Sequence, residues 1–302
     1  MAVPTPHAEA LARIPVQERE AAILGSSTRF WDYGPEDADD VIVLVHGYRG
    51  DHHGLEPVIA QLDGIRIISP DLPGFGLSTP MTDAPHSVAG YGLWLDAFLR
   101  QLALPTPPVI LGHSFGSMVT SHALAEGVPA RALILVNPIS SDPKLAAGRG
   151  ITGLIRAFYG VSRALPERAA RGWLGNWVIV QFMSMTLVTN GDPVLTKWIH
   201  EEHHRYFNGF SDARTVAEGF RASVSTQVGA AAPRVTVPTL MIAGSVDRIA
   251  PLDGQQRTVE LFPDARLVVV DGVGHLAHYE TPQPVAAAIR AFLAELPPEP
   301  TR

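Results

Sequence analysis

Three residues that lie far apart in the chain could together perform nucleophilic catalysis. Ser114 stands in the pattern Gly112-His113-Ser114-Phe115-Gly116, directly after a short apolar run. Asp247 and His275 each follow a later apolar run. A serine hydroxyl is a weak nucleophile at neutral pH, so it needs a histidine base and a carboxylate that orients this base. These residue types therefore predict covalent acyl chemistry on Ser114.

The segments around Ser114 predict a nucleophile elbow. Residues 108–111 have the character of a buried strand, and residues 117–125 have helical character. A serine at so sharp a strand-to-helix turn adopts a cramped backbone conformation, and the glycines at 112 and 116 leave room for it. Its hydroxyl would stand at the carboxyl edge of a sheet, where open α/β sheets bind ligands.

Short apolar runs alternate with helical segments along most of the chain. Unbroken apolar strands of this kind are typical of parallel sheets that are covered on both faces. The pattern predicts the α/β class, with a doubly wound, mostly parallel sheet. The expected strands are 41–45, 65–68, 109–111, 133–136, 239–242 and 267–270, with an antiparallel strand near 28–33, and the expected helices are about 53–62, 88–102, 116–127, 253–261 and 282–295.

The alternation breaks between about residues 140 and 233, which are rich in helical and large apolar segments. We expect a helical cap, residues 140–233, inserted into an α/β core of residues 1–139 and 234–302. Residues 172–191 carry no charge, and arginines precede them. We interpret this stretch as packed cap helices that line an apolar pocket with Trp177 and Phe182. A helix resting on a lipid surface is the alternative, and a membrane span is the least favoured interpretation.

Composition excludes several classes of protein. The 302 residues carry a net charge of −7, which argues against a nucleic-acid partner. The chain has no cysteine, so disulfides and thiolate metal sites are excluded. The absence of cysteine is compatible with a reducing cytoplasm, and residues 1–22 lack the pattern of a secretory signal, so we expect a cytoplasmic protein. The segment 142–234 has eleven basic and seven acidic residues, so the cap is positive while the rest is negative.

Other residues compete for the roles of carboxylate and base. Asp247 and His275 are preferred because both follow strands that should end at the same sheet edge as Ser114, in the chain order serine, aspartate, histidine. The competing assignments are Asp253, Asp271 and His278. We expect Asp253 to begin a helix and His278 to lie where the chain turns away from the site.

Acyl chemistry also needs two hydrogen-bond donors for the developing oxyanion. The backbone N–H of Phe115, at the helix start, is one candidate. The other is the backbone N–H of Tyr48, which follows His46 and Gly47 after the strand at 41–45. Gly47 allows a close approach, and His46 is expected to brace the loop without titrating. His46, Gly47 and His113 are also expected beside the substrate pocket.

Together these segments resemble the α/β-hydrolase superfamily, in its capped serine-hydrolase branch of esterases and lipases. The resemblance rests on residues 46–48, 71–78 and 112–116, the Asp247 loop and Gly274-His275, so it spans residues 41–278. One departure is Ser117, where many relatives have a second glycine. The resemblance implies attack by Ser114 on a carbonyl, proton transfer through His275, and release of the acyl group by water. Similar enzymes that form alkyl esters have aspartate at the elbow, so serine favours acyl substrates.

The favoured function is hydrolysis of a carboxylic ester of a hydrophobic small molecule, without a cofactor. One alternative with the same triad is hydrolysis of a carbon–carbon bond in a ring-fission product, where a cap arginine such as Arg156 or Arg163 would bind the substrate carboxylate. Acyl transfer, perhydrolysis and a ligand-binding relative without activity are further alternatives. The expected partners are this substrate and, through the cap, a weak peripheral contact with a membrane. The chain is expected to be a monomer or homodimer.

One further pattern suggests a metal. Residues 200–204 read His-Glu-Glu-His-His, which matches the zinc-binding pattern H-E-x-x-H and would place His200 and His204 on one helix face. No third ligand is evident. We therefore interpret the match as chance on an exposed, charged cap helix, and expect no metal. The glycine-rich loop at 71–78 lacks the spacing of a phosphate-binding loop, so no nucleotide is expected.

Overall fold

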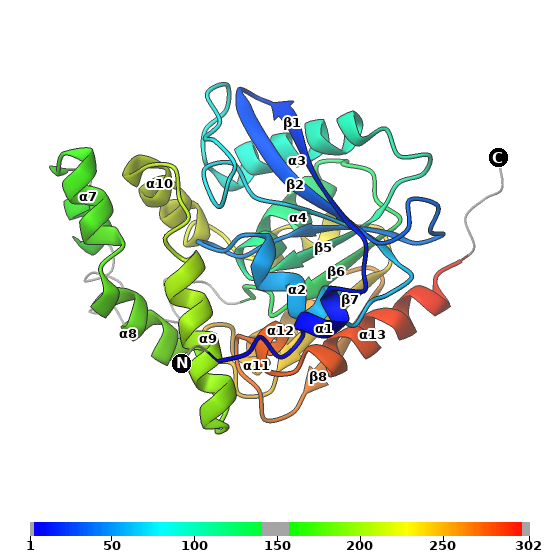
Figure 1. The fold of residues 1–302 in the computed structure, drawn as a ribbon. Helices are drawn as coiled ribbons and strands as arrows, with labels where there is room; N and C mark the ends of the chain where they lie inside the picture. Colours follow the sequence, from blue (N-terminus) through cyan, green and yellow to red (C-terminus); the bar gives the residue numbers. More distant parts are fainter. Residues whose placement is uncertain (1–2, 141–156, 163, 298–302) are drawn as a thin grey trace.

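An eight-stranded sheet forms the centre of the molecule (Figure 1). The computed structural model describes residues 3–140, 157–162 and 164–297. The strand order is β1-β2-β4-β3-β5-β6-β7-β8; β1 pairs antiparallel with β2 and β2 with β4, and the other neighbours are parallel. The strands are β1 Val16–Ile23, β2 Ser26–Tyr33, β3 Val41–Val45, β4 Arg66–Pro70, β5 Val109–His113, β6 Ala132–Val136, β7 Thr239–Gly244 and β8 Ala265–Val270. The predicted doubly wound, mostly parallel sheet is confirmed.

Helices cover both faces of this sheet because successive residues of each parallel strand point to opposite sides. In β3, Val43 and Val45 belong to the core cluster that contains Trp94 of α3. Ile42 and Leu44 belong to the cluster on the other face, which contains residues of α2 and α13. The core helices are α1 Ala8–Leu11, α2 Glu56–Ile59, α3 Val88–Leu102, α4 Phe115–Ala125, α11 Leu252–Val259, α12 Ala277–Glu280 and α13 Pro282–Glu295.

Two local expectations need correction. The helix expected at 53–62 is a 3-10 turn, η1 His52–Leu55, followed by the short α2. Strand β1 was not predicted, because it is an edge strand whose polar residues 17–20 hide the apolar alternation. Leu24 and Gly25 join it to β2 with positive φ angles of 48° and 77°, as a tight hairpin turn requires.

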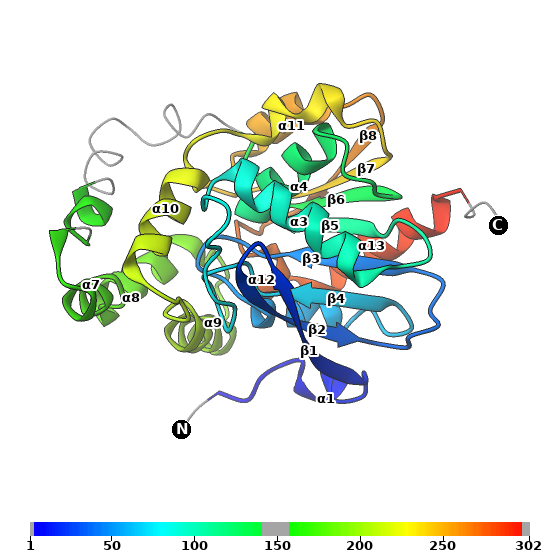
Figure 2. The ribbon, with the colours of Figure 1, turned by 90° about the horizontal axis from the view of Figure 1, so that it is seen from above.

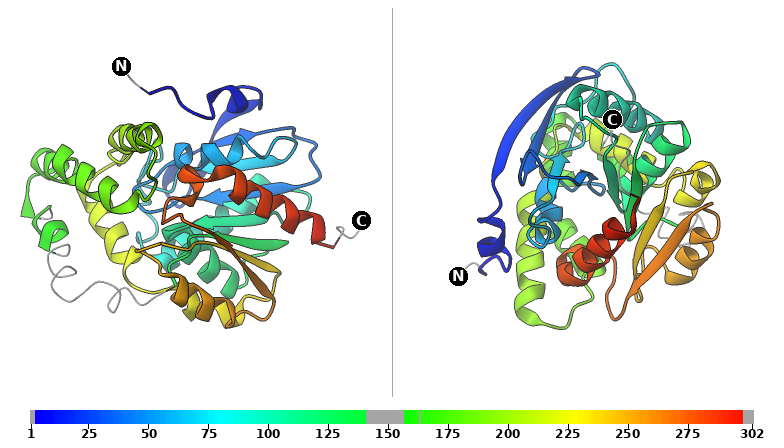
Figure 3. Two further views of the ribbon diagram at one scale, coloured as in Figure 1. Left: turned by 90° about the horizontal axis from the view of Figure 1, so that it is seen from below. Right: turned by 90° about the vertical axis from the view of Figure 1, so that its right-hand side faces the viewer.

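Helices α7–α10 lie between β6 and β7 in the chain and stand together at one end of the molecule (Figures 2 and 3). They are α7 Glu167–Leu174, α8 Trp177–Leu187, α9 Pro193–Tyr206 and α10 Ala213–Ser223. Two short 3-10 turns, η2 Val228–Ala230 and η3 Ala232–Arg234, lead back to β7. A helical insertion is therefore present, whereas its boundaries at 140 and 233 stay a prediction.

The uncharged stretch 172–191 is divided between two helices. The chain leaves α7 at Gly175, and the side chain of Asn176 accepts a hydrogen bond from the N–H of Val178 and so caps α8. Among the residues that the structure describes, no helix is long and apolar enough to cross a membrane.

Candidate active site

The chain turns sharply at Ser114, between β5 and α4. Ser114 has φ 50° and ψ −115°, an unusual conformation for a residue with a side chain. A Cβ atom at Gly116 would collide with the carbonyl oxygen of Val45 in the backbone of β3. One at Gly112 would lie 2.6 Å from the Gly116 carbonyl oxygen. The two glycines therefore let the elbow pack against β3, and the partly exposed Ser114 side chain remains accessible.

Ser114, His275 and Asp247 meet at the carboxyl edge of the sheet. Ser114 Oγ lies 2.8 Å from His275 Nε2, and His275 Nδ1 lies 2.8 Å from Asp247 Oδ2. His275 and Asp247 are buried. Asp247 follows β7 and His275 follows β8, so the ends of three parallel strands bring these two residues to Ser114, more than 100 positions earlier in the chain. This geometry can pass a proton from a hydroxyl to an imidazole whose other nitrogen is bound by a carboxylate.

Asp247 is held by hydrogen bonds on both oxygens. Its Oδ1 accepts from the N–H groups of Ile249 and Ala250 at 2.8 and 2.9 Å, and its Oδ2 accepts from Asn137 Nδ2 at 3.0 Å. Burial alone would raise the pKa of Asp247, but the neighbouring His275 and these backbone donors hold it below its ordinary value. The group therefore remains a carboxylate at neutral pH.

The competing residues lie outside this arrangement. Asp253 is exposed in the first turn of α11 and pairs with Arg257. Asp271 accepts a hydrogen bond from Ser245. His278 is buried in α12, with its ring centroid 4.0 Å from that of His113.

The two candidate oxyanion donors flank Ser114. Phe115 is the first residue of α4, so its N–H belongs to the donors without a partner inside the helix. On the other side, a Cβ atom at Gly47 would lie 3.3 Å from Ser114 Cβ, which places the Gly47-Tyr48 peptide beside the nucleophile candidate. The pairing of these N–H groups with an oxyanion stays a prediction.

His46 braces this loop, as expected from the sequence. Its Nδ1 lies 2.8 Å from the Gly47 carbonyl oxygen, and its Nε2 accepts a hydrogen bond of 2.8 Å from the N–H of Leu72. Burial lowers the pKa of His46 below its ordinary value. The ring is therefore neutral, and it ties the loop after β3 to the loop after β4.

Two polar residues near the site were not predicted in these roles. The side chain of Asn137, with φ 46° directly after β6, bonds both Asp247 and the Gly274 carbonyl oxygen. Ser117 donates a hydrogen bond to the Ser114 carbonyl oxygen and accepts one from the N–H of Ile139. The departure from glycine at 117 therefore adds a link between the elbow and the segment after β6. For Asn137, the only signal in the sequence was its position directly after a predicted strand.

Aromatic side chains gather where the insertion meets the oxyanion loop. The Tyr48 ring lies 5.8 Å from Phe75, 6.2 Å from Tyr159 and 6.3 Å from Phe220, measured between centroids. Its hydroxyl donates to the carbonyl oxygen of Val216 in α10 at 2.8 Å. These four rings form an apolar wall next to one candidate oxyanion donor.

Arg49, the next residue, joins the same loop to the insertion. It has φ 62° and is 1% exposed. Its guanidinium donates to the carbonyl oxygens of Leu174 and Phe207 and to Asn208 Oδ1, each at 3.1 Å. Leu174 ends α7 and Phe207 follows the last residue of α9, so the cation sits at two helix C-termini, where the dipole favours it.

The expected pocket residues of the insertion are not enclosed. Trp177 and Phe182 are 64% and 66% exposed on α8, and Trp177 stacks on His204. Side chains with this much exposure do not support the expectation that Trp177 and Phe182 line a closed pocket. Arg156 and Arg163 lie outside the described residues. Val178 and Met185 are also exposed on α8, and contact of this face with a membrane stays a prediction.

Helix α9 was expected to be an exposed, charged helix, and this is wrong. Trp198, Ile199 and His203 are buried. His200 Nδ1 lies 2.5 Å from Ser184 Oγ, and His204 Nε2 lies 2.8 Å from Gln181 Oε1. The two histidines of the H-E-x-x-H pattern therefore bind side chains of α8.

Among the described residues, one further cluster has metal-binding side chains close enough together to hold an ion. Asp51, His52 and His53 offer ligand atoms within 4.8 Å of one another. His53 is already hydrogen-bonded to Asp51, and His52 to Asp71. The two imidazole rings also stack between Trp31 and Tyr206. These contacts explain the cluster as a structural link between β2, η1 and α9.

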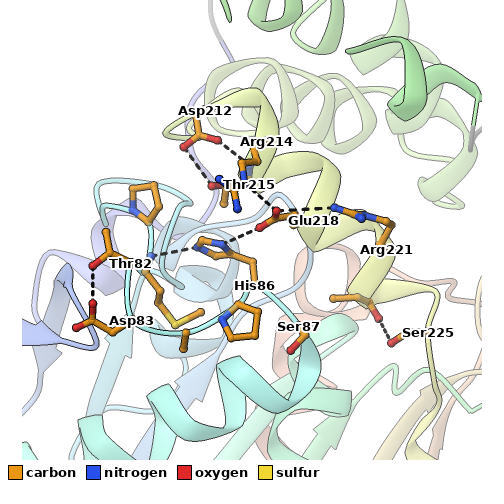
Figure 4. A pocket seen from close by; sticks show the side chains of 15 residues that line it. Thr82, Asp83, His86, Ser87, Asp212, Arg214, Thr215, Glu218, Arg221 and Ser225 are labelled. Carbon is orange, nitrogen blue, oxygen red and sulfur yellow. Dashed lines mark hydrogen bonds and ion pairs between the residues drawn. The ribbon is translucent and has the colours of Figure 1, made fainter. Parts of the chain in front are cut away.

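A groove of about 1000 Å³ lies between the loop at 80–87 and α10, and Figure 4 shows the side chains that line it. Glu218 at its centre accepts a hydrogen bond from Arg214 at 2.9 Å and lies 3.2 Å from His86 Nδ1. Arg221 pairs with the same carboxylate at 3.8 Å. Two arginines and a histidine of the groove thus share one carboxylate, and Ser114, Asp247 and His275 do not line it.

Acid should destabilise the fold through buried histidines. Burial and neighbouring histidines lower the pKa of both His113 and His203 to about 3, against about 6.5 in an unfolded chain. Because the unfolded chain binds protons that the folded one does not, the free energy of unfolding falls as the pH drops below about 6.5. Each such histidine contributes a loss of about 2 kcal/mol between pH 7.5 and pH 5. Urea unfolding at the two pH values measures this loss.

The variant His203→Leu should reduce this pH dependence by about 2 kcal/mol. Equal stability of the unmodified protein at pH 7.5 and pH 5 contradicts the prediction.

Comparison with known families assigns the chain to one of them. The model of the alpha/beta hydrolase family matches residues 42–288. The chain therefore belongs to the alpha/beta hydrolase family, in agreement with the sheet and the insertion described above.

Individual relatives are distant. The chain is 26% identical to a pimeloyl-[acyl-carrier protein] methyl ester esterase of Stenotrophomonas maltophilia, over 85% of this chain and 94% of the relative. It is 24% identical to a putative carbamate hydrolase, RutD, of Pseudomonas syringae pv. syringae, over 91% and 92%. A thermophilic esterase from Thermogutta terrifontis has a similar fold, with a TM-score of 0.73 and 22% identity over 93% of this chain and 99% of that one.

Proposed function

We propose that the protein is a serine hydrolase that cleaves a carboxylic ester of a hydrophobic small molecule through an acyl-enzyme. The observation that carries this proposal is the chain of two 2.8 Å contacts from Ser114 Oγ through His275 to Asp247. The strained elbow and the partial exposure of Ser114 support it further.

The arrangement suggests a reaction in two halves, acylation of Ser114 and then deacylation. Ser114 Oγ attacks the ester carbonyl carbon while its proton moves to His275 Nε2, and Asp247 stabilises the imidazolium that forms. The N–H groups of Tyr48 and Phe115 bind the oxyanion. His275 then gives the proton to the oxygen of the leaving alcohol. In the second half, water attacks the acyl-enzyme, His275 takes its proton and returns it to Ser114 Oγ, and the carboxylic acid leaves.

A hydrophobic ester is favoured by two observations. The rings of Phe75, Tyr159 and Phe220 pack around Tyr48, so the surroundings of the proposed oxyanion site are apolar. One relative is named as a methyl ester esterase. Carbon–carbon bond hydrolysis remains the alternative with the same triad, and it requires a cation for the substrate carboxylate.

A covalent probe and a substrate panel test the proposal. We expect a fluorophosphonate to label Ser114, as identified by peptide mass spectrometry, and p-nitrophenyl esters with short and medium acyl chains to be hydrolysed. A ring-fission product is assayed in parallel, and its faster turnover would favour the alternative. A protein that leaves the probe unreacted and all substrates intact would be a ligand-binding relative, and the proposal would fail.

Chelation should not affect this activity. The described contacts engage His200 and His204 with α8, and the proposed steps need no metal. We expect EDTA treatment followed by gel filtration to leave ester turnover within about twofold of the untreated enzyme, since general acid–base chemistry accounts for every proton transfer. Loss of activity that added Zn²⁺ restores would contradict this expectation.

A further inference from the structure

Thr189, between α8 and α9, contacts the loop that carries His275. Its hydroxyl accepts a hydrogen bond of 2.8 Å from the N–H of Gly274, the residue before His275. The same hydroxyl donates to Glu280 Oε2 at 2.7 Å. Glu280 Oε1 accepts from the N–H groups of Thr189 and Asn190 at 2.6 and 3.2 Å. The carboxylate of Glu280, buried at the end of α12, is thus bound by three donors of the insertion.

The peptide groups of Gly274 are therefore held from two directions. Asn137, where the chain leaves the core, donates to the Gly274 carbonyl oxygen at 3.1 Å, while Thr189 binds its N–H. A Cβ atom at Gly274 would lie 2.5 Å from Thr189 Cγ2, so the insertion also packs tightly against this residue.

Apolar contacts seat the same segment. Leu276 and Tyr279, on the far side of His275, form a buried cluster with Trp198 and Ile199 of α9. Leu187 and Val188, directly before Thr189, pack against this cluster. Residues on both sides of His275 are therefore in contact with the insertion.

We propose that Thr189, fixed by Glu280, is a positioning residue that sets the backbone before His275 and so aligns the imidazole with Ser114. This inference rests on the proposed function. The contact between the insertion and Glu280 then completes the geometry of the triad. A hydroxyl that both donates and accepts is required at residue 189, which valine cannot supply and serine can.

Substitution at Thr189 tests the proposal. Thr189→Val removes both side-chain hydrogen bonds, while the N–H of residue 189 can still bind Glu280. Because small errors in the placement of reacting groups cost up to about 100-fold, we expect kcat for a p-nitrophenyl ester to fall about 10- to 100-fold with KM changed less than about threefold. The rate of fluorophosphonate labelling should fall by the same factor, since it also needs the His275 base. Thr189→Ser should recover most of the rate.

Thr186→Val is the matched control. Thr186 lies three residues earlier on the exposed side of α8, and its hydroxyl bonds the Met183 carbonyl oxygen of its own helix. This variant should keep the kcat and labelling rate of the unmodified protein. Glu280→Gln, which replaces one acceptor oxygen by an amide donor, should lower kcat in the same direction and serves as the test if Thr189→Val does not fold.

Three results are decisive. A low kcat for Thr189→Val that serine rescues, with Thr186→Val unaffected, supports the positioning role. Normal kcat in folded Thr189→Val, or a Thr189→Ser enzyme as slow as the valine variant, overturns it. An unmodified protein that neither reacts with the probe nor hydrolyses any ester overturns the proposed function itself, and this inference with it, before the variants are compared.

Discussion

Replacing Ser114 by alanine should lower kcat for ester hydrolysis by about 10⁴- to 10⁶-fold, since the members of such a triad act as a unit. The methyl group cannot form the acyl bond, and His275 then has no hydroxyl to deprotonate within its 2.8 Å contact. The oxyanion donors and the apolar wall remain, so substrate binding should persist. Stopped assays at high enzyme concentration measure the residual rate of the variant, and fluorophosphonate titration counts the active sites of the unmodified protein.

A second serine on the same helix provides the control. Ser121 of α4 donates its hydroxyl hydrogen bond to the carbonyl oxygen of Ser117 and does not contact His275. Ser121→Ala should therefore retain kcat within about threefold, in line with the loss of one neutral hydrogen bond away from the reacting atoms. A Ser114→Ala enzyme that keeps more than about one per cent of the rate is inconsistent with Ser114 as nucleophile.

The second large effect is expected for Asp247→Asn, at about 10⁴-fold in kcat. Oδ1 of Asp247 accepts two backbone N–H groups, and Oδ2 accepts from His275 and Asn137. An amide must turn its NH₂ group toward one of these sets of donors. If it faces His275, the imidazole proton moves to Nε2 and cannot be replaced by the Ser114 proton. If it faces residues 249 and 250, two backbone donors lose their acceptor and the loop is displaced.

The pH profile distinguishes this loss from a simple titration. The pKa of Asp247 is lowered, so stability that its charge contributes is present above about pH 3.9 and is lost only as the pH falls through the lower folded value. Between pH 6 and pH 9 Asp247 therefore stays a carboxylate, and its own titration does not change kcat of the unmodified protein in this range. Asp253→Asn, at the exposed and rejected candidate, should change neither kcat nor its profile. A comparable loss in that variant would argue against the assignment.

The core of the fold was predictable because its signals are local. Each parallel strand is a continuous apolar run, and each of Ser114, Asp247 and His275 directly follows one of them. Parallel strands share one carboxyl edge, so sequence order alone places the three residues near one another. The charged edge strand β1 lacks this signal, since half of its pattern faces solvent.

The contacts of the insertion were not predictable in the same way. Trp177 and Phe182 were expected in a pocket because their stretch is apolar, but an apolar helix does not indicate which of its faces is covered. The side chains of Asn137 and Thr189 bind a loop 85 or more residues away, and nothing in the neighbouring sequence marks a polar residue for such a partner. Tertiary placement alone decides these roles.

The buried guanidinium of Arg49 has a consequence for engineering. Within the part of the chain that the structure describes, it is satisfied by two helix-end carbonyl oxygens and one amide oxygen rather than by a carboxylate. An insertion taken from another hydrolase would leave the Arg49 guanidinium without hydrogen-bond partners unless it had acceptors at the same positions. Such an uncompensated buried charge is strongly destabilising. The insertion therefore cannot be exchanged independently of the core. In a chimaera of this protein, residue 49 must be changed together with the insertion.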